Sequence, residues 1–442
     1  MTDAPRKVMF VRDPVSGTLR LSPLQEDLLK TVEVQRLSFV HQLGTTFQCY
    51  PGAHGMRLSH ALGVSSLSAA IARSILPPGP GTEQEVSLLE AAGMLHDIGH
   101  TPWSHTLEPL FLEMTGADHM DLVADMVTGR RVMGIRGSGS IPGILEAHGL
   151  AAGEVAALIR CRFDRKAYLQ QIIFGEVDAD MLDYLQRDFY FTGVAFGHIE
   201  TDRLISTMKI VDDQLVFLSK GLDAVRDFLL ARIQMYSSVY LHKKTRIVDQ
   251  MLLRASRRSI LELGEIESFH EMTDDELLSF LVNRSGDPWV RDMGWRVKYR
   301  QRLFSQVFRI DAASPTSDDE KFINSLREMG TSPSVTARRL ETDISSEAGV
   351  EPGLVLVDLP LEAVKVSEER FERTGIMFVD PSGRIRSLDE MDPPFAEYLA
   401  AARPNRSLLT VACSPEHTAA VSAACRKIFH AAVSPLFADL ED

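Results

Sequence analysis

The chain has 442 residues, which is enough for two or three domains and a sizeable core. Its apolar content of 45% and charged content of 24% are ordinary for a soluble globular protein. The net charge of −14 argues against a general, sequence-independent grip on a nucleic-acid backbone. It leaves room for a local basic pocket that holds a small phosphorylated ligand.

The cysteine pattern and the N-terminal stretch indicate the compartment. The four cysteines are scattered and form no CxxC pair, which disfavours a disulfide framework or a zinc ribbon. The N-terminal stretch is charged and lacks an apolar signal core. No apolar run is long enough to span a bilayer. We therefore expect a cytoplasmic protein with no membrane partner.

The N-terminal third is predicted to contain one hairpin followed by helices. Apolar and polar residues alternate around a turn at residues 13–17, which indicates a β-hairpin. From Leu24 to about Leu76 the apolar residues recur at helical spacing, broken by a turn at residues 50–53. A Pro-Gly run at residues 77–81 ends this segment.

A second helix is predicted to begin near Thr82, with Glu85 completing a capping box, and to run to about Ile98. A glycine- and serine-rich loop follows at residues 136–140. Helical patterns dominate again to roughly Leu253.

The composition changes past residues 313–318. Short β-rich runs follow at residues 354–357, 376–379 and 408–411, which indicates a small α+β region at the C-terminus. The predicted fold class is therefore mainly α, with an N-terminal β-hairpin and a small α+β C-terminal region.

Four side chains with metal-ligand chemistry occur within the predicted helices. They are His60, the dipeptide His96-Asp97 and Asp180. Two imidazoles and two carboxylates form a mixed nitrogen and oxygen set that suits one divalent metal. Such a metal can polarise a phosphorus–oxygen bond and lower the pKa of a bound water, so the pattern points to hydrolysis of a phosphate ester. The long separations require that helix packing assembles the site.

A purely structural interpretation competes with the metal site. A lone His-Asp dipeptide is more often an ordinary pair satisfied by hydrogen bonds, because two-residue motifs match frequently by chance. Here, however, His96, His100 and His105 stand close together among apolar and small residues. Polar groups in such surroundings need partners or a metal, which favours the functional interpretation.

Further polar residues recur at helical spacing. His105 and Glu108 are three residues apart and share a helix face, which can fix the tautomer of a general acid or base. Two other stripes invite a substrate role, although a salt-bridged amphipathic helix or simple packing would give the same spacing. The stripes are Asp180, Tyr184, Arg187 and Asp188, and then Arg232, Tyr236 and Tyr240.

Residues 57–64, 96–105 and 177–188, in this order, closely resemble the motifs of HD-domain phosphohydrolases. The nearest branch is the deoxynucleoside triphosphate triphosphohydrolases, which residues 35–53 and 232–242 also fit. The resemblance covers about residues 6–255. Together with the residue patterns above, this predicts an N-terminal hairpin over 1–23, an HD-domain core over 24–255, a helical extension over 256–320 and an α+β domain over 321–442.

The resemblance also implies roles for individual residues. The metal ligands would be His60, His96, Asp97 and Asp180, and the metal would be manganese, magnesium, iron or nickel. The implied catalytic residues are His100 and the pair Glu108 and His119. The implied substrate contacts are Gln42 and Leu43 at the deoxyribose, Arg57, His105 and Arg232 at the phosphates, and Tyr184, Asp188 and Tyr240 at the sugar or base.

Two positions depart from the family pattern. Met120 follows His119 where the family usually has glutamate. Met181 stands where the family commonly has a lysine or arginine that reaches the phosphates, so a polyphosphate should be held less strongly. Lys243, Lys244, Arg246 or a residue of another subunit are candidates to compensate.

We therefore expect a metal-dependent phosphohydrolase that converts a deoxynucleoside triphosphate to deoxynucleoside and tripolyphosphate, and that assembles as a homo-oligomer, a dimer or tetramer. One alternative is an HD phosphatase acting on a nucleoside monophosphate or another phosphorylated metabolite. A second is a nucleotide-binding regulator, which a complete ligand set disfavours. A third, nucleic-acid binding or cleavage, is disfavoured by the net charge.

Overall fold

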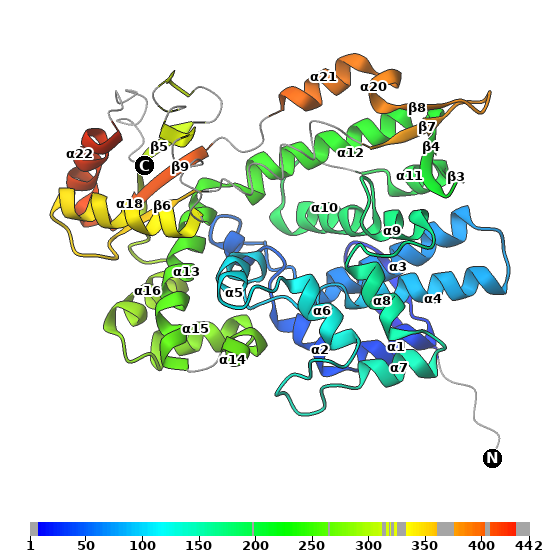
Figure 1. Ribbon diagram of the computed structural model, residues 1–442, viewed down its shortest axis with the longest axis horizontal. Coiled ribbons are helices and arrows are strands. Elements are labelled where there is room, and N and C mark those ends of the chain that lie inside the picture. Colours follow the sequence, from blue (N-terminus) through cyan, green and yellow to red (C-terminus); the bar gives the residue numbers. More distant parts are fainter. Residues whose placement is uncertain are drawn as a thin grey trace.

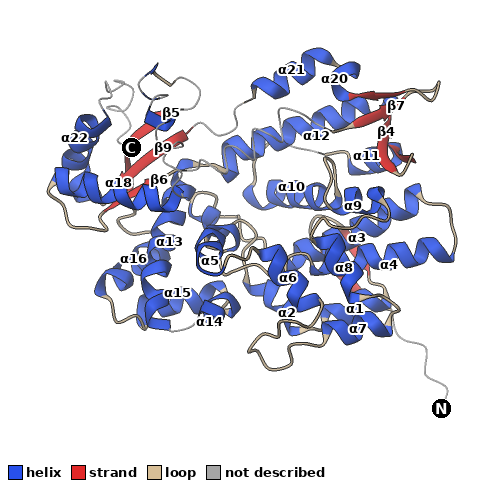
Figure 2. Ribbon diagram, in the orientation of Figure 1, coloured by secondary structure: helices blue, strands red, loops and turns tan. Residues whose placement is uncertain are grey.

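The computed structural model describes residues 8–196, 199–263, 266–311, 315–317, 319, 322–324, 333–359, 375–402 and 407–429. Helices dominate these residues, and the strands gather in a few small sheets (Figure 2). The predicted fold class, mainly α with an N-terminal hairpin and a small α+β C-terminal region, is confirmed.

The first half of the chain contains β1 (Phe10–Asp13), β2 (Gly17–Arg20), α1 (Pro23–Leu29), α2 (Val32–Arg36), η1 (Leu37–Phe39), η2 (Gly44–Gln48), α3 (Arg57–Ile75), α4 (Pro80–Leu95), η3 (Ser104–Thr106), α5 (Glu108–Thr115), α6 (His119–Val127), α7 (Ile141–Ala147), α8 (Ala152–Ile159), α9 (Ala167–Ile173) and α10 (Ala179–Thr192). The second half contains α11 (Thr201–Thr207), β3 (Met208–Val211), β4 (Gln214–Leu218), η4 (Ser219–Gly221), α12 (Leu222–Met235), η5 (Tyr236–Tyr240), α13 (Lys243–Leu263), α14 (Ile266–Glu271), α15 (Asp274–Asn283), α16 (Pro288–Tyr299), β5 (Ser305–Asp311), α18 (Pro333–Ala348), β6 (Val355–Asp358), β7 (Met377–Val379), β8 (Ile385–Ser387), α20 (Leu388–Met391), α21 (Pro393–Ala401), β9 (Ser407–Cys413), η6 (Pro415–His417) and α22 (Thr418–Phe429).

The predicted N-terminal hairpin is confirmed. Strands β1 and β2 pair antiparallel, and Gly17 closes the turn with a φ of +79° that favours glycine. The carboxylate of Asp13 accepts hydrogen bonds from the backbone N–H groups of Val15 and Ser16 at 3.0 and 2.6 Å. These bonds fix the Asp13 side chain, which is buried against the core.

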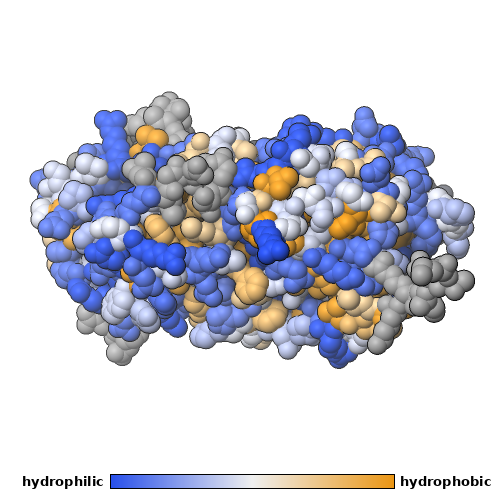
Figure 3. Space-filling view, turned by 90° about the horizontal axis from the view of Figure 1, so that it is seen from below, coloured by the Kyte–Doolittle hydropathy of each residue, from blue (hydrophilic) through white to orange (hydrophobic). Residues whose placement is uncertain are grey.

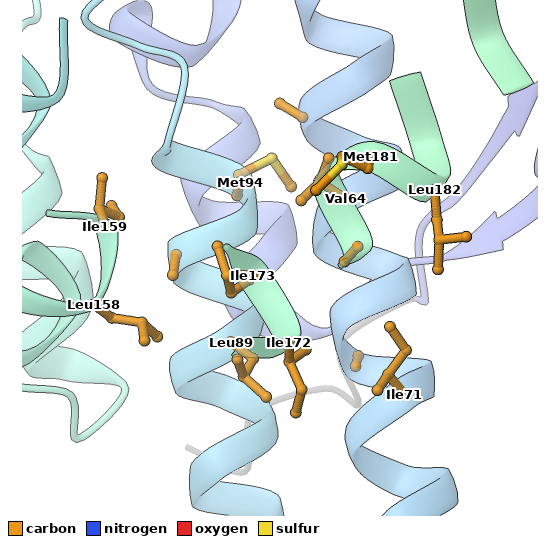
Figure 4. Close-up of a cluster of buried hydrophobic side chains, with 14 of the residues drawn as sticks. Val64, Ile71, Leu89, Met94, Leu158, Ile159, Ile172, Ile173, Met181 and Leu182 are labelled. Carbon is orange, nitrogen blue, oxygen red and sulfur yellow. The ribbon is translucent and has the colours of Figure 1, made fainter. Parts of the chain in front are cut away.

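Helices α3 and α4 form the central pair of the core (Figure 1). Gly93 allows their close approach, because a Cβ there would lie 2.8 Å from the Ser65 backbone. Buried apolar side chains from α3, α4, α9 and α10 interdigitate around the pair (Figure 4). This packing fixes the backbone from which the candidate ligands project.

The predicted capping box of α4 is wrong. The helix begins at Pro80 with Gly79 as the N-cap and no side-chain cap, and the Thr82 hydroxyl donates to the Pro77 carbonyl instead. Proline at the first helical position supplies a preset φ, so the helix begins earlier than Thr82. It also ends at Leu95 rather than Ile98, which places His96 at the C-cap as the sequence predicted.

The C-terminal segments contribute to two sheets rather than one. Strand β7 pairs parallel with β4 of the helical core, and the order of this sheet is β3-β4-β7-β8. The hairpin β3-β4 lies in a stretch that the sequence predicted as helical. Apolar periodicity identified the β7 run as a strand, but pairing across such a sequence separation depends on tertiary packing.

The remaining C-terminal strands form the expected α+β region. The antiparallel sheet β5-β9-β6 packs with α18 and α22, in the upper left of Figure 1. Strand β5 precedes the predicted boundary at residue 320, and the domain boundaries themselves stay a prediction. Helices α13 to α16 connect this sheet to the core through a second apolar cluster, which includes Trp103 and Leu107 of the stretch between α4 and α5 and Leu356 of β6.

The surface is largely hydrophilic on the face of Figure 3, with separate apolar patches. This agrees with the acidic composition. None of the helices among the described residues is both long enough and apolar enough to cross a membrane.

Candidate active site

Two histidines from neighbouring helices meet at the centre of the core. The Nε2 atoms of His60, on α3, and His96, at the end of α4, lie 3.3 Å apart. His60 Nδ1 donates to the Asp183 carboxylate at 2.8 Å, and His96 Nδ1 donates to the Gly93 carbonyl at 2.9 Å. Because both Nδ1 atoms donate to fixed acceptors, both Nε2 atoms face the same point.

Two carboxylates border this point. Asp180, near the start of α10, has Oδ1 at 3.0 Å from His60 Nε2 and 3.8 Å from His96 Nε2. Asp97 has Oδ1 at 3.3 Å from His96 Nε2 and Oδ2 at 3.8 Å from His60 Nε2. Ligand atoms of His60, His96 and Asp180 all lie within 4.8 Å of one another. The four predicted metal ligands are thus brought together.

The donor set fits a divalent cation. Burial lowers the pKa of His60, but hydrogen bonds to Asp180 and Asp183 and the charge of Asp97 outweigh burial and raise that pKa to about 10. The carboxylates therefore stabilise a positive charge at the point that the two imidazoles face. Mixed imidazole and carboxylate donors suit manganese, iron, nickel or magnesium. A metal bound there would replace the proton that His60 otherwise holds.

A second layer of side chains orients His60. Asp183 accepts from His60 and also from Arg187. The Nε of Arg187 donates to Asp183 Oδ2 and its Nη2 donates to Asp183 Oδ1, both at 2.8 Å. Arg187 is fully buried and also donates to Asp13 of the hairpin at 2.8 Å. Gly63 leaves space for this pair, because a Cβ there would overlap Asp183 and Arg187. Sequence reasoning missed Asp183, although its i+3 spacing from Asp180 was a usable signal.

The expected substrate stripe on α10 is therefore partly wrong. Arg187 points into the core, not toward a ligand, because the carboxylates of Asp183 and Asp13 neutralise it there. Asp180 and Tyr184 remain on the side of the site, where the rings of Tyr184 and His60 lie 6.5 Å apart.

A second histidine cluster adjoins the first. Glu108, the first residue of α5, accepts from His105 Nδ1 at 2.7 Å and from the Nδ1 of His119, the first residue of α6. The ring of His119 stacks on that of His100 with centroids 4.2 Å apart. His100 Nε2 in turn lies 3.2 Å from Asp97. The predicted catalytic residues therefore form one chain of contacts that ends at the candidate metal site.

The charges of this cluster assign its proton positions. Burial raises the pKa of Glu108, but the hydrogen bonds from His105 and His119 reverse this and hold it far below the usual range. Burial lowers the pKa of His119, but Glu108 outweighs burial and raises it. Burial, Arg57 and His119 lower the pKa of His100 well below its usual value. Glu108 thus favours the charged form of His119, whereas the surroundings of His100 favour its neutral form.

Arg57, His100 and Gln42 each have a buried polar side-chain atom without a hydrogen-bond partner among the described residues. These atoms are Arg57 Nη2, His100 Nδ1 and Gln42 Oε1. The rest of the Arg57 guanidinium is fixed, because Nη1 donates to Asp97 and Nε donates to the Ser104 hydroxyl, both at 2.6 Å. Buried polar atoms without partners are costly, so these atoms fit a polar ligand.

Aromatic rings of Tyr184 and Tyr240 lie next to the candidate metal site. Tyr240 donates its hydroxyl to Asp188 at 2.8 Å, and its ring lies 6.1 Å from that of Tyr184. Burial raises the pKa of Asp188 to about 7, against the opposing effect of the Tyr240 hydrogen bond. Residues 236–240 form a π-helical turn, a feature frequent at functional sites, directly after α12 with its buried Arg232.

The position of Met181 explains one departure from the expected pattern. Its side chain is 5% exposed and lies in the core beside Met94 and Val64 (Figure 4). It therefore contributes apolar packing. Arg246, a candidate to compensate, is held by Asp358 at 2.6 Å, whereas Lys243 and Lys244 are exposed.

Comparison with known proteins agrees with this geometry. The HD domain model matches residues 57–188, which run from Arg57 to Asp188 and contain all four candidate ligands. The model of an HD associated region matches residues 199–435, more than half of the chain. The chain belongs to the HD-domain phosphohydrolases. HD domains bind divalent metals, and this member has the histidine and aspartate group to hold one.

Relatives of this HD-domain protein include both uncharacterized proteins and named enzymes. The uncharacterized protein YwfO of Bacillus subtilis is 29% identical over 394 residues, 85% of this chain and 86% of that protein. The deoxynucleoside triphosphate triphosphohydrolase SAMHD1 homolog of Dictyostelium discoideum is 28% identical over 263 residues, 56% of this chain and 48% of that protein. Human SAMHD1 is 24% identical over 327 residues, 64% of this chain and 52% of that protein. The alignments therefore span about half of the SAMHD1 proteins.

Solved structures share the fold of this HD-domain chain. A hypothetical protein from Aquifex aeolicus has a TM-score of 0.71 at 24% identity, covering 95% of this chain and 100% of that one. A phosphohydrolase from Bacteroides thetaiotaomicron has a TM-score of 0.68 at 23% identity, covering 92% and 99%. The similarity extends over the C-terminal region as well as the HD core.

Proposed function

We propose that this HD-domain phosphohydrolase hydrolyses deoxynucleoside triphosphates to deoxynucleoside and tripolyphosphate, with one divalent metal ion per site. The observation that carries the proposal is the adjacency of two groups. The ligand cluster of His60, His96 and Asp180 lies beside buried polar atoms of Arg57 and His100 that have no partner among the described residues. The SAMHD1 relatives supply the substrate class, as their name states.

The phosphate side of the site supports cleavage at the α-phosphate. His60, His96, Asp97 and Asp180 would hold the metal, which when bound polarises a phosphorus–oxygen bond and lowers the pKa of a bound water. Arg57 Nη2 has no partner among the described residues and can donate to a phosphate oxygen, and Arg232 would add charge. His105, with a side chain 66% exposed, would reach phosphates nearer the entrance.

The raised pKa of His119 supports a role as general acid. Water attacks the α-phosphorus and loses a proton to the surrounding solvent, and the bond to the 5′ oxygen breaks. His119 donates the proton that this oxygen takes up. Glu108 keeps His119 charged and oriented for that transfer. The neighbouring His100, held neutral, is suited to accept a hydrogen bond rather than compete as an acid.

The sugar side supports recognition of a deoxynucleoside. Leu43 would pack against C2′ of the sugar, because an added hydroxyl there would lack both space and a partner. Gln42 Oε1 is a buried acceptor without a partner among the described residues, so it can receive a sugar hydroxyl. Asp188, paired with Tyr240, and the ring of Tyr184 would contact the sugar and base.

One observation favours a second candidate, an HD phosphatase that acts on a nucleoside monophosphate. Met181 is buried and Arg246 is bound to Asp358, so neither supplies charge to a polyphosphate. Fewer cations at the site would suit a substrate with fewer phosphates.

A substrate panel tests the proposal. Protein loaded with Mn²⁺ is incubated with dNTPs, NTPs and dNMPs, and the products are resolved by chromatography. We expect tripolyphosphate and deoxynucleoside from dNTPs, and loss of all turnover when His96 and Asp97 are replaced by Ala. His148→Ala, which removes a histidine paired with Asp27 at 3.0 Å on the surface, serves as the matched control. Orthophosphate released from dNMPs alone would reject the triphosphate substrate in favour of the phosphatase.

We also propose that the chain assembles as a dimer or tetramer. The large exposed apolar side chains Phe10, Phe39 and Tyr190, each about 60% exposed, offer surface that a second copy can bury. Light scattering after size-exclusion chromatography measures the assembly, and a monomeric mass at micromolar concentration would reject it.

A further inference from the structure

Two loops distant in sequence meet at the edge of the site. The first site loop, residues 41–48, carries Gln42 and Leu43, and the second site loop, residues 100–108, carries His105. They approach closely at Gly44, whose φ is +49° and where a Cβ would lie 2.5 Å from the Thr106 hydroxyl. The spacing of these loops therefore sets the distance between the proposed sugar contact and the proposed phosphate contacts.

One carboxylate oxygen joins the two loops. Asp249 Oδ1, on α13, accepts from the Thr45 hydroxyl at 2.6 Å and from the Thr106 hydroxyl at 2.9 Å. Thr45 is fully buried and lies two residues after Leu43, while Thr106 directly follows His105. Because both threonines bond to the same atom, neither loop can shift without breaking or stretching one of these bonds.

Asp249 lies outside the matched HD domain, on helix α13, which is held in place by an ion pair and by apolar packing. On the same helix, Arg246 forms a two-pronged ion pair with Asp358 of β6, both contacts at 2.6 Å. The apolar face of α13, including Val248 and Met251, is buried in the cluster that also holds Trp103 and Leu107 of the second site loop. The C-terminal sheet is thereby coupled through α13 to the site loops.

A second carboxylate secures the loops at their other ends. Asp274, at the start of α15, accepts from the backbone N–H of His41 at 2.8 Å and from that of Trp103 at 2.6 Å. Loss of the Asp249 contact would therefore leave the loops attached to the protein. What it would release is the segment next to Leu43 and His105.

We propose that Asp249 is a positioning residue that fixes the spacing of the two site loops and thereby sets discrimination at the 2′ position of the sugar. The second half of this inference rests on the proposed function, in which Leu43 excludes a 2′-hydroxyl. Displacements below 1 Å matter at such a contact, because steric exclusion of one hydroxyl depends on close packing. Asp249 itself need not touch the substrate.

Variants at Asp249 separate its hydrogen bonds from its charge. Asp249→Asn keeps an oxygen that can accept both hydroxyls, whereas Asp249→Leu has a similar size and no acceptor. We expect Asp249→Leu to raise KM for dNTPs and to reduce the dNTP/NTP ratio of kcat/KM about tenfold, the equivalent of one or two hydrogen bonds. Asp249→Asn should stay within about twofold of the wild type.

The matched control is another carboxylate of α13. Glu262 accepts from the Ser285 hydroxyl at 3.0 Å and from the Gly286 N–H at 2.7 Å, away from the site. Glu262→Leu should lose stability without changing the dNTP/NTP ratio. An unchanged ratio in Asp249→Leu, or the same change in Glu262→Leu, would overturn the inference.

Two further measurements cover the remaining outcomes. If Asp249→Leu does not fold, Thr45→Val and Thr106→Val take its place, with Thr45→Ser as the rescue that restores the donor. Hydrogen exchange of residues 41–48 and 100–108 is measured with Mn²⁺ present and no nucleotide. It tests only the loop clamp, meaning the joining of the two site loops by Asp249. We expect faster exchange in Asp249→Leu than in Asp249→Asn, and equal exchange would reject the clamp. A wild-type protein without dNTP turnover would instead reject the proposed function, while the exchange experiment would still decide the clamp.

Discussion

Asp183 accepts the Nδ1 proton of His60 at 2.8 Å and so directs the Nε2 lone pair of that histidine toward the candidate metal. Partners of this kind typically account for 10- to 100-fold in metal affinity. We expect Asp183→Asn to weaken Mn²⁺ binding by about that factor, measured by calorimetry or competition with a chelating dye. Asp13→Asn removes the other carboxylate charge that holds Arg187 and leaves the hydrogen bond between His60 and Asp183 in place. Equal loss of affinity in both variants would show that burial of Arg187, and not orientation of His60, is what matters.

The pair Glu108 and His119 predicts a shift in the pH profile. Glu108 raises the pKa of His119, so a general acid there stays protonated to higher pH and activity falls only as pH rises through that raised value. Glu108→Gln removes the charge and should move the alkaline limb to lower pH. It should also reduce kcat about 100-fold with little change in KM. A profile measured from pH 5.5 to 9.5 checks this, and an unmoved limb would assign the proton transfer elsewhere.

Tyr240 predicts how Asp188 recognises the sugar. The pKa of Asp188 is about 7 because burial raises it, while the Tyr240 hydroxyl opposes that rise by stabilising the charged form. Tyr240→Phe should raise the pKa further, so less of Asp188 is ionised at pH 7. We expect KM for the substrate to rise roughly tenfold at pH 7 and to recover as pH increases. A KM increase that does not depend on pH would mean that Tyr240 acts through direct contact with the substrate.

His270 predicts acid sensitivity of the fold. It is fully buried on α14 and donates Nε2 to the Gly99 carbonyl at 2.9 Å, and burial together with Arg36 lowers its pKa to about 3. The unfolded chain takes up this proton near pH 6.5, but the folded chain does not. The free energy of unfolding should therefore fall by up to about 1.4 kcal/mol per pH unit below pH 6.5.

His270→Gln keeps a donor for Gly99 and removes the titration. Its free energy of unfolding, measured in urea between pH 4.5 and 7.5, should depend less steeply on pH than that of the wild type. Identical slopes for the two proteins would mean that other groups control the acid sensitivity.

Much of the site can be predicted from the sequence, because the metal-binding chemistry depends on the residue types themselves. The imidazoles and carboxylates of His60, His96, Asp97 and Asp180 are suited to binding one metal ion, and the apolar spacing places them on helices. The spacing also placed His96 at the end of α4 and paired Glu108 with His105. The structure contains both this position and this hydrogen bond. The alternation around residues 13–17 was sufficient for the hairpin.

Spacing, however, identifies the face of an element and not the neighbour that it meets. Arg187 shares a stripe with Tyr184, yet it is buried because Asp13, 174 residues away, neutralises it there. Met181 faces the core for the same reason that its neighbour Asp180 faces the site, since successive helical residues diverge by about 100°. The sequence by itself determined which atoms can hold a metal and a phosphate. Only the tertiary structure decided what orients them, including the joining of two distant loops by Asp249, because such contacts depend on how separate helices pack.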